Sequence, residues 1–327
     1  MRLFAVACLS WLLVSSYAAA AEPTHVEKGT FRFTPRGDQQ DIPARYRLET
    51  RTFDYEMSLK YDLARCDVSV YRLRFPSPVE SPHPENNTVH AEYYVPKGKG
   101  PFPGVIVLDI TGGNQSLSRG MATYLAQNKI AGLFVQMAYY GPRRPPGSKL
   151  RLLSPDLNHT MAAIRQTVLD LRAAAAWLES RPEIDVKRLG ILGTSLGSFM
   201  ATLTAEMEPR LGRVAILLGG GGFVDAYYDH PLARPYRQVF EALGGSKEKI
   251  AQMLAPVDPL TCAANLKQRQ VLMLAAQRDE IVPPKMATAL WNAAGRPKIV
   301  WYNCGHYSAL LYLPDGLDHI LRHFAAE

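Results

Sequence analysis

The feature that most constrains this chain is a serine between two glycines, set where a short apolar run ends and a helical pattern begins. Residues 186–198 read VKRLGILGTSLGS, which contains Gly-x-Ser-x-Gly centred on Ser195. Apolar residues at helical spacing follow and predict a helix from about Leu196. A serine on a tight strand-to-helix turn projects its hydroxyl above the sheet, and the flanking glycines let the turn close. We therefore predict that Ser195 is a nucleophile.

A serine hydroxyl is a poor nucleophile at neutral pH and needs a histidine base that a carboxylate orients. Asp279 follows the apolar run at 270–276, and His306 follows the run at 298–302. Each lies just beyond the expected C-terminal end of a strand, where α/β sheets place their chemistry. The chain order serine, acid, histidine predicts a catalytic triad of Ser195, Asp279 and His306.

Other residues compete for two of these roles. Glu280 adjoins Asp279 and Asp225 follows the preceding strand, so both are alternative acids. His319 and His323 also lie downstream, but they fall on the expected final helix and are more typical of surface residues. We favour Asp279 because a shift of one residue would aim the carboxylate away from the site.

With these motifs the chain resembles an α/β-hydrolase of the esterase, dienelactone hydrolase and acetyl xylan esterase kind. The resemblance extends from about Pro101 to the C-terminus and depends on GTSLG at 193–197, RDEIVP at 278–283 and Gly305-His306. It implies that Ser195 is the nucleophile, Asp279 the orienting acid and His306 the general base and acid. It implies no cofactor and no metal.

Hydrolases of this fold stabilise the oxyanion with two backbone N–H groups. One should belong to Leu196, which follows the nucleophile. The other should come from the loop after the apolar run at 104–108, where Asp109-Ile110 stands in place of the family's common His-Gly. We assign the second donor to Thr111, with Ile110 and Gly112 as alternatives.

The pattern from Pro101 onward alternates strand and helix, which is typical of a mainly parallel, twisted sheet covered by helices on both faces. Strands are expected at 104–108, 132–137, 213–218, 270–276 and 298–302, and an amphipathic helix at 161–178. Upstream, β-forming runs at 30–33, 68–73 and 89–95 are separated by proline-rich loops. We expect an N-terminal β-rich extension at 22–85 and an α/β-hydrolase domain at 86–327.

The segment at 223–267, between two of these expected strands, is too long for an ordinary connection. Its aromatic and apolar residues are typical of a helical insertion that acts as a lid over an acyl pocket. We expect Tyr139 and Tyr140, from a loop opposite, to contact the substrate with it. The alternative is a packed helical pair without substrate contact.

Residues 1–21 have the basic start, apolar core and small-residue end of a signal peptide, with cleavage expected after Ala21 or one residue earlier. The alternative is an uncleaved membrane anchor, but the run barely reaches the length that spans a bilayer. A secreted or periplasmic protein without stable membrane insertion is therefore expected. After cleavage Cys66, Cys262 and Cys304 remain, which allows one disulfide and leaves one thiol.

The formal charge of +7 is scattered along the chain, and its densest basic cluster is Arg143-Arg144. A basic balance favours anionic surfaces or substrates in general. No nucleic-acid-binding motif accompanies it, so we expect no nucleic-acid partner. The sequence leaves the oligomeric state open.

Taken together, the sequence predicts an exported serine esterase that cleaves carboxylic esters through an acyl-enzyme intermediate. Small acyl esters or carbohydrate esters are the expected substrates. An exported serine peptidase of the same fold, a perhydrolase with the same residues, and a non-catalytic binding protein are the alternatives. Fold alone does not decide between them.

Overall fold

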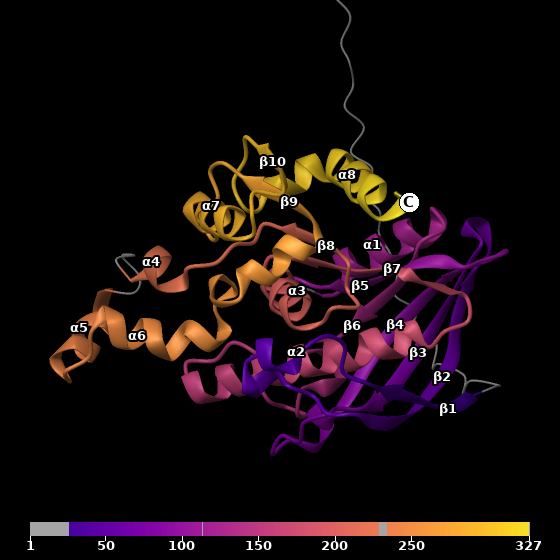
Figure 1. Cartoon of the computed structure of the whole chain (residues 1–327), viewed down its shortest axis with the longest axis horizontal. Helices are drawn as coiled ribbons and strands as arrows, with labels where there is room; N and C mark the ends of the chain where they lie inside the picture. The colour runs from indigo at the N-terminus through magenta and orange to yellow at the C-terminus, as the bar shows by residue number, and fades with distance from the viewer. Residues whose placement is uncertain (1–25, 113, 229–233, 327) are drawn as a thin grey trace, which may run out of the picture.

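The computed structural model describes residues 26–112, 114–228 and 234–326. These residues form a ten-stranded sheet in the order β1-β2-β3-β4-β6-β5-β7-β8-β9-β10 (Figure 1). The expected signal peptide, residues 1–21, lies outside the described residues. None of the described helices combines the length and the hydropathy needed to cross a membrane.

The N-terminal half of the sheet is antiparallel. Each of its strands pairs with the next, and the fourth then pairs antiparallel with β6. Aromatic side chains from successive strands stack on one face, with ring centroids of Phe31 and Phe53 5.1 Å apart. The N-terminal extension therefore continues the hydrolase sheet and shares its core. Its strands are β1 (Val26–Phe33), β2 (Arg51–Leu63), β3 (Val68–Pro76) and β4 (Thr88–Pro96).

The C-terminal half of the sheet is parallel, as the alternating pattern predicts. Parallel strands end at the same edge, so the loops that follow them meet there. The expected mainly parallel sheet is confirmed for this half. Its strands are β5 (Phe102–Leu108), β6 (Ala131–Val135), β7 (Ile184–Thr194), β8 (Arg213–Leu217), β9 (Gln270–Ala276) and β10 (Lys298–Tyr302).

Helices cover both faces of the sheet and bury two apolar clusters. One cluster lies under α1 (Ser116–Gln127) and α8 (Leu313–Ala325). The other lies under α2 (Leu157–Glu179), α3 (Leu196–Met207) and α7 (Pro284–Ala293). The amphipathic helix expected at 161–178 falls within α2. The sheet and the two layers of helices that cover its faces together form the three layers of the α/β-hydrolase fold.

The expected helical insertion is present between β8 and β9. Figure 1 shows α5 and α6 projecting away from the sheet and its covering helices. The helices are α4 (Phe223–Tyr227), α5 (Arg234–Ala242) and α6 (Lys247–Leu254), followed by 3-10 turns at Ala255–Val257, Pro259–Thr261 and Ala263–Gln268. Further 3-10 turns lie at Gln39–Asp41, Ala44–Tyr46, Ala64–Cys66, Pro84–Asn87, Gly141–Arg143 and Ser308–Tyr312.

The three cysteines of the described residues are free thiols. Cys66 accepts a hydrogen bond from the Gln127 side chain, and Cys304 is buried beside the Asp279 loop. Cys262 lies at the root of the insertion, where burial raises its pKa to about 11. The disulfide that the cysteine count allowed is therefore not formed among them.

Candidate active site

Ser195 occupies a strained turn between β7 and α3. Its backbone has φ 52° and ψ −117°, in a region that residues other than glycine seldom adopt. The turn is held by the Ser195 N–H, which donates to Leu217 O at 2.8 Å, and by the Ser198 N–H, which donates to Ser195 O at 2.9 Å. Both ends of the turn are thus fixed, and the serine side chain stands above the C-terminal edge of the sheet.

The two glycines of the motif are required by close backbone contacts. A Cβ at Gly193 would lie 2.0 Å from Gly197 O, and one at Gly197 would lie 2.5 Å from Asp109 O. Both distances are below any that real Cβ atoms show, and backbone atoms cannot move aside. The two glycines that predict the turn in the sequence are therefore also required for its packing.

The structure brings Ser195, His306 and Asp279 together from three separate loops. His306 Nε2 lies 3.1 Å from Ser195 Oγ, and His306 Nδ1 lies 2.8 Å from Asp279 Oδ2. All three side chains are buried. His306 follows β10 and Asp279 follows β9, so the parallel register of neighbouring strands places them at one edge. The spacing matches the hydrogen bonds that activate a serine nucleophile.

The Asp279 carboxylate is fixed by its own turn. Its Oδ1 accepts hydrogen bonds from the backbone N–H groups of Ile281 at 2.9 Å and Val282 at 2.7 Å. These donors stabilise a negative charge and aim the second oxygen at His306. The neighbouring Glu280 contacts the backbone of His306 instead, where its Oε2 accepts a hydrogen bond from the N–H at 3.1 Å. Asp279, and not Glu280, thus contacts the imidazole.

The other competing residues lie away from Ser195. Asp225 is exposed and pairs with Lys247 at 2.7 Å. His319 pairs with Asp315 one turn away on α8. His323 lies on α8 beside the backbone of Val214 and Gln270, where burial lowers its pKa to about 4. None of the three side chains is in position to reach the serine.

The loop after β5 reaches the same pocket as Ser195. Ile110 and Thr111 both line that pocket. Leu196 begins α3, so its N–H belongs to the free first turn of that helix. The assignment of Leu196 and Thr111 as oxyanion donors stays a prediction, with Ile110 and Gly112 as the alternatives.

Tyr139 and Tyr140 do not line the pocket that contains Ser195. Both are buried in the core. The Tyr139 ring packs against His83 and His159, with centroids 5.6 and 4.5 Å away. The Tyr140 hydroxyl faces the backbone of Gly112. The expectation that these tyrosines contact the substrate is not met, since neighbouring side chains enclose them.

The expected lid does not cover the pocket either. No described residue between 223 and 267 lines it. Among the described residues of the insertion, Tyr227 contacts the Asp279 loop, because its hydroxyl donates to Ile281 O. Burial and the nearby Asp279 carboxylate raise the pKa of Tyr227 to about 12, so the hydroxyl stays protonated. The insertion thus contacts the Asp279 loop through Tyr227. Its helices α5 and α6 extend away from the sheet (Figure 1).

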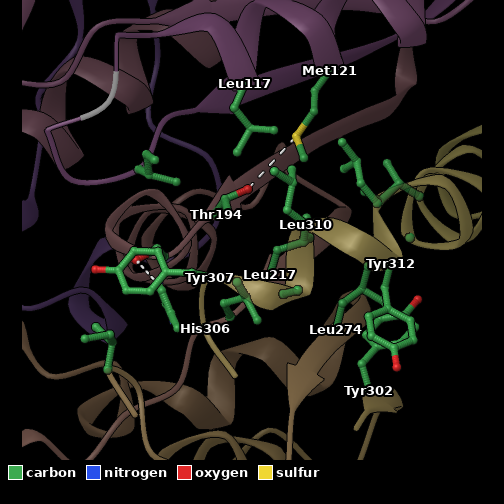
Figure 2. Close-up of a pocket in the computed structure, with 18 of the residues that line it drawn as sticks. Leu117, Met121, Thr194, Leu217, Leu274, Tyr302, His306, Tyr307, Leu310 and Tyr312 are labelled. Atoms are coloured by element: carbon green, nitrogen blue, oxygen red, sulfur yellow. Dashed lines mark hydrogen bonds between the residues drawn. The ribbon is translucent and has the colours of Figure 1, made fainter. Parts of the chain in front are cut away.

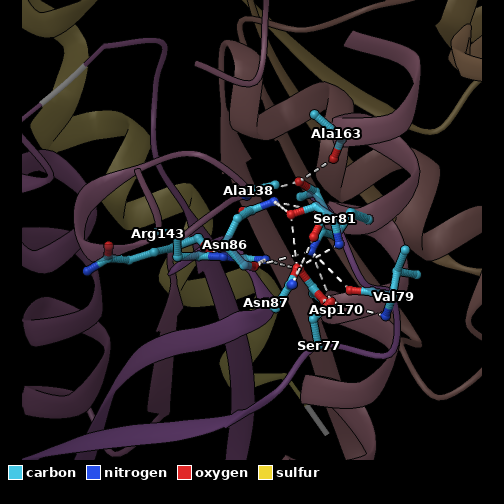
Figure 3. Close-up of polar contacts among 12 residues, drawn as sticks. Ser77, Val79, Ser81, Asn86, Asn87, Ala138, Arg143, Ala163 and Asp170 are labelled. Carbon is cyan, nitrogen blue, oxygen red and sulfur yellow. Dashed lines mark hydrogen bonds and ion pairs between the residues drawn. The ribbon is translucent and has the colours of Figure 1, made fainter. Parts of the chain in front are cut away.

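Arg143 is fully buried, although it belongs to the densest basic cluster of the sequence. Its guanidinium donates to Asp170 Oδ2 at 2.7 Å and to the carbonyls of Gln136 and Asn86. Ser77 donates to the other Asp170 oxygen at 2.6 Å. Figure 3 shows these side chains converging between α2 and the loops that end β3 and β6. The network anchors the 136–143 loop behind the site.

Replacing Asp170 with alanine should destabilise the protein by about 3–5 kcal/mol, because it leaves the buried Arg143 charge without its partner. Burial raises the pKa of Asp170, and the positive charge of Arg143 opposes that rise. The Arg143 guanidinium therefore favours the charged form of the Asp170 carboxylate. Urea unfolding would measure the loss.

Asp185→Ala is the matched control for that variant. The Asp185–Arg188 pair has the same 2.7 Å contact, but both side chains are about one quarter exposed. Its loss should cost about 0–1 kcal/mol. Equal effects of the two substitutions would contradict the anchoring role of Asp170.

Beside Ser195 lies a cavity of about 450 Å³. Apart from Ser195 and His306, its walls are mostly aliphatic and aromatic side chains from α1, α8, the 3-10 turn at Ser308–Tyr312 and the ends of four strands. Sequence reasoning missed this cavity, because its residues are scattered from Ile110 to Ile320. The one signal that could have indicated these residues is that many of them lie at the ends of strands or on two helices of the same face.

Two protein families match the chain. The prolyl oligopeptidase family matches residues 162–305, and the family described as alpha/beta hydrolase domain containing 18 matches residues 39–221, more than half of the chain. Among curated relatives, the uncharacterized Mycobacterium tuberculosis protein Rv2627c is 30% identical over 145 residues, which are 43% of this chain and 33% of that protein. The chain thus spans about a third of that relative's length. Rv2307c of the same organism is 26% identical over 72% of this chain and 74% of that protein.

Solved structures show the same fold. Acetyl xylan esterase 1 from Thermoanaerobacterium sp. JW/SL YS485 has a TM-score of 0.67 at 20% identity, covering 82% of this chain and 87% of that one. A putative dienelactone hydrolase from Klebsiella pneumoniae has a TM-score of 0.54 at 20% identity, covering 80% of this chain and 99% of that one. The resemblance to an α/β-hydrolase is therefore confirmed. The chain belongs to the family of alpha/beta hydrolase domain containing 18.

Proposed function

We propose that the protein is an exported serine esterase that hydrolyses carboxylic esters at Ser195. The observation that carries the proposal is the continuous line of contacts from Asp279 through His306 to Ser195 Oγ, with lengths of 2.8 and 3.1 Å. The fold neighbours named as esterases support the same class of reaction. The export part rests on the leader-like sequence of residues 1–21.

In the first half of the reaction Ser195 Oγ attacks the ester carbonyl carbon while its proton passes to His306 Nε2. The tetrahedral oxyanion accepts hydrogen bonds from the N–H groups of Leu196 and Thr111. The bond to the alcohol oxygen then breaks, and His306 returns the proton to that oxygen. The alcohol leaves and the acyl group stays on Ser195.

In the second half water replaces the alcohol. His306 takes a proton from the water, the hydroxyl attacks the acyl carbon, and the bond to Ser195 Oγ breaks as His306 protonates it. Asp279 holds the imidazole with Nδ1 protonated throughout, so Nε2 is free to accept. The carboxylic acid leaves and the enzyme is restored.

The decisive experiment is labelling of the mature protein with a fluorophosphonate, located by peptide mass, beside hydrolysis of p-nitrophenyl acetate and butyrate. Label on Ser195 together with ester turnover is the expected result, and acetylated and feruloylated glycans would then be screened. Neither label nor turnover in a folded sample would refute the proposal in favour of a binding role.

A peptidase activity is the second candidate, because the prolyl oligopeptidase family matches the region from α2 to His306's loop. Peptide p-nitroanilides tested beside the esters would decide between them. A peptide preferred over every ester would overturn the esterase assignment. N-terminal sequencing of the protein recovered outside the cytoplasm tests export, with Glu22 as the expected first residue.

A further inference from the structure

The cavity beside Ser195 has a floor that crosses four strands in register. Thr194 of β7 pairs with Leu217 of β8, and Leu217 pairs with Leu274 of β9. Leu274 pairs with Val300 of β10, and Tyr302 follows on the same face two residues later. A row of side chains therefore runs sideways across the sheet, away from the serine.

The rest of the cavity is lined by two helices on the same face and by the 3-10 turn at Ser308–Tyr312. Leu117 and Met121 come from α1, and Leu313, Gly316 and Ile320 come from α8. Figure 2 shows His306 and Tyr307 at one end of the cavity and Tyr302 and Tyr312 at the other, with Leu217 and Leu310 between them. The space is thus a slot between sheet and helices that starts at the reacting serine; we name it the acyl slot.

The chemistry of the acyl slot suits a hydrocarbon. No Asp, Glu, Lys or Arg occurs among the described residues that line it. The Tyr302 hydroxyl is already committed to Asp315 at 2.6 Å, and the Thr194 hydroxyl points to the Met121 sulfur at 4.0 Å. Between Thr194 and Tyr302 the row contributes only the apolar side chains of Leu217 and Leu274. Sugar hydroxyls placed over these two leucines would have no hydrogen-bond partner from the row, which is unfavourable.

The length of the acyl slot follows from the spacing of the strands. Strands in a sheet lie about 4.8 Å apart, so the three steps from β7 to β10 span about 14 Å. An extended alkyl chain advances about 1.3 Å per carbon, given C–C bonds of about 1.5 Å. About ten carbons therefore reach from Ser195 to Tyr302.

We propose that the acyl slot binds the acyl chain of the substrate, and that straight saturated acyl groups of about eight to ten carbons are preferred over acetyl. This inference rests on the proposed ester hydrolysis at Ser195. It narrows the expected substrate, because the aliphatic part of the ester, and not a sugar, occupies the slot. The alcohol part lies outside the acyl slot.

Gly316 sets the depth of the slot. It is the one glycine among the described lining residues, and it lies on the buried side of α8. A Cβ at Gly316 would lie 3.4 Å from Leu274 Cδ1 and 3.9 Å from Tyr302 Oη. A methyl group fits there in ordinary contact, but a larger side chain would fill the space between Leu274 and Tyr302.

The test compares p-nitrophenyl acetate, butyrate, octanoate and decanoate on the full-length mature protein. For the wild-type enzyme kcat/KM should rise about fourfold per added methylene until the slot is full. Gly316→Leu should lower kcat/KM for octanoate and decanoate by roughly tenfold or more and leave acetate nearly unchanged. Gly120→Leu is the matched control, because Gly120 lies on α1 with open space around its Cβ position. It should alter no substrate.

Each other result would overturn the inference in a distinguishable way. A wild-type enzyme that labels at Ser195 but prefers acetate would refute the acyl slot and leave ester hydrolysis standing. Equal losses on acetate and decanoate in Gly316→Leu would refute the role of Gly316. No label and no hydrolysis of any ester would refute the proposed function itself. If Gly316→Leu fails to fold, the wild-type chain-length series still decides whether the acyl slot binds the acyl group.

Discussion

Replacing Ser195 with alanine is expected to lower kcat for ester hydrolysis by about 10⁶-fold. The substitution removes the oxygen that forms the acyl-enzyme, and His306 alone cannot supply it. Alanine keeps the Cβ of serine, so the turn with φ 52° bears the same strain as before. Stopped assays with p-nitrophenyl esters and loss of fluorophosphonate label from the Ser195 peptide would measure the effect.

Ser116→Ala provides the control for this prediction. Ser116 is an exposed residue at the start of α1, and its substitution removes a hydroxyl of the same kind. Its activity and melting temperature should match those of the wild type. If kcat of Ser195→Ala stayed within about tenfold of the wild-type value, a nucleophile other than Ser195 would have to form the acyl-enzyme.

The sequence predicts the parallel half of the fold well because its signals are local. The strand ranges 270–276 and 298–302 agree with β9 and β10 to the residue. Both are short runs of apolar and β-forming residues bounded by polar turns. The Gly-x-Ser-x-Gly signal is also local, since it occupies five consecutive residues and Gly193 packs against Gly197 within it.

The longest strand, β2, was not predicted, although its pattern is present. Phe53, Tyr55 and Met57 are buried, and the residues between them are exposed, which is the period of a half-buried strand. Charged residues in the exposed positions lower the mean hydropathy of the segment and disguise it. In the structure β2 pairs antiparallel with β1 on one side and with β3 on the other, which joins the N-terminal region to the sheet.

Which residues contact the substrate depends on tertiary packing that no local pattern records. Arg143 and Tyr139 are adjacent to loop signals, yet the fold turns both inward against α2 and the loops around it. The residues of the acyl slot are single positions on α1, α8 and four strands. Their common face follows from the strand order, which the sequence does not state.

Replacing Asp279 with asparagine should lower kcat by about 10⁴-fold while the protein stays folded. The amide oxygen can still accept from the Ile281 and Val282 N–H groups, so the turn is preserved. The amide NH2 then faces His306 Nδ1 and donates to it, which places the imidazole proton on Nε2. A protonated Nε2 cannot accept the Ser195 proton. Single-turnover and steady-state assays on one ester, with circular dichroism as the check on folding, measure the loss.

Glu280→Gln is the matched control, because Glu280 adjoins Asp279 and binds the same histidine through a different atom. Its Oε2 accepts the His306 backbone N–H, and an amide oxygen can accept that bond equally well. The expected loss is less than about tenfold, since only a charge outside the imidazole contact is removed. If Glu280→Gln were as inactive as Asp279→Asn, the orienting charge would belong to Glu280. A large loss in Asp279→Asn alone assigns it to the carboxylate that touches Nδ1.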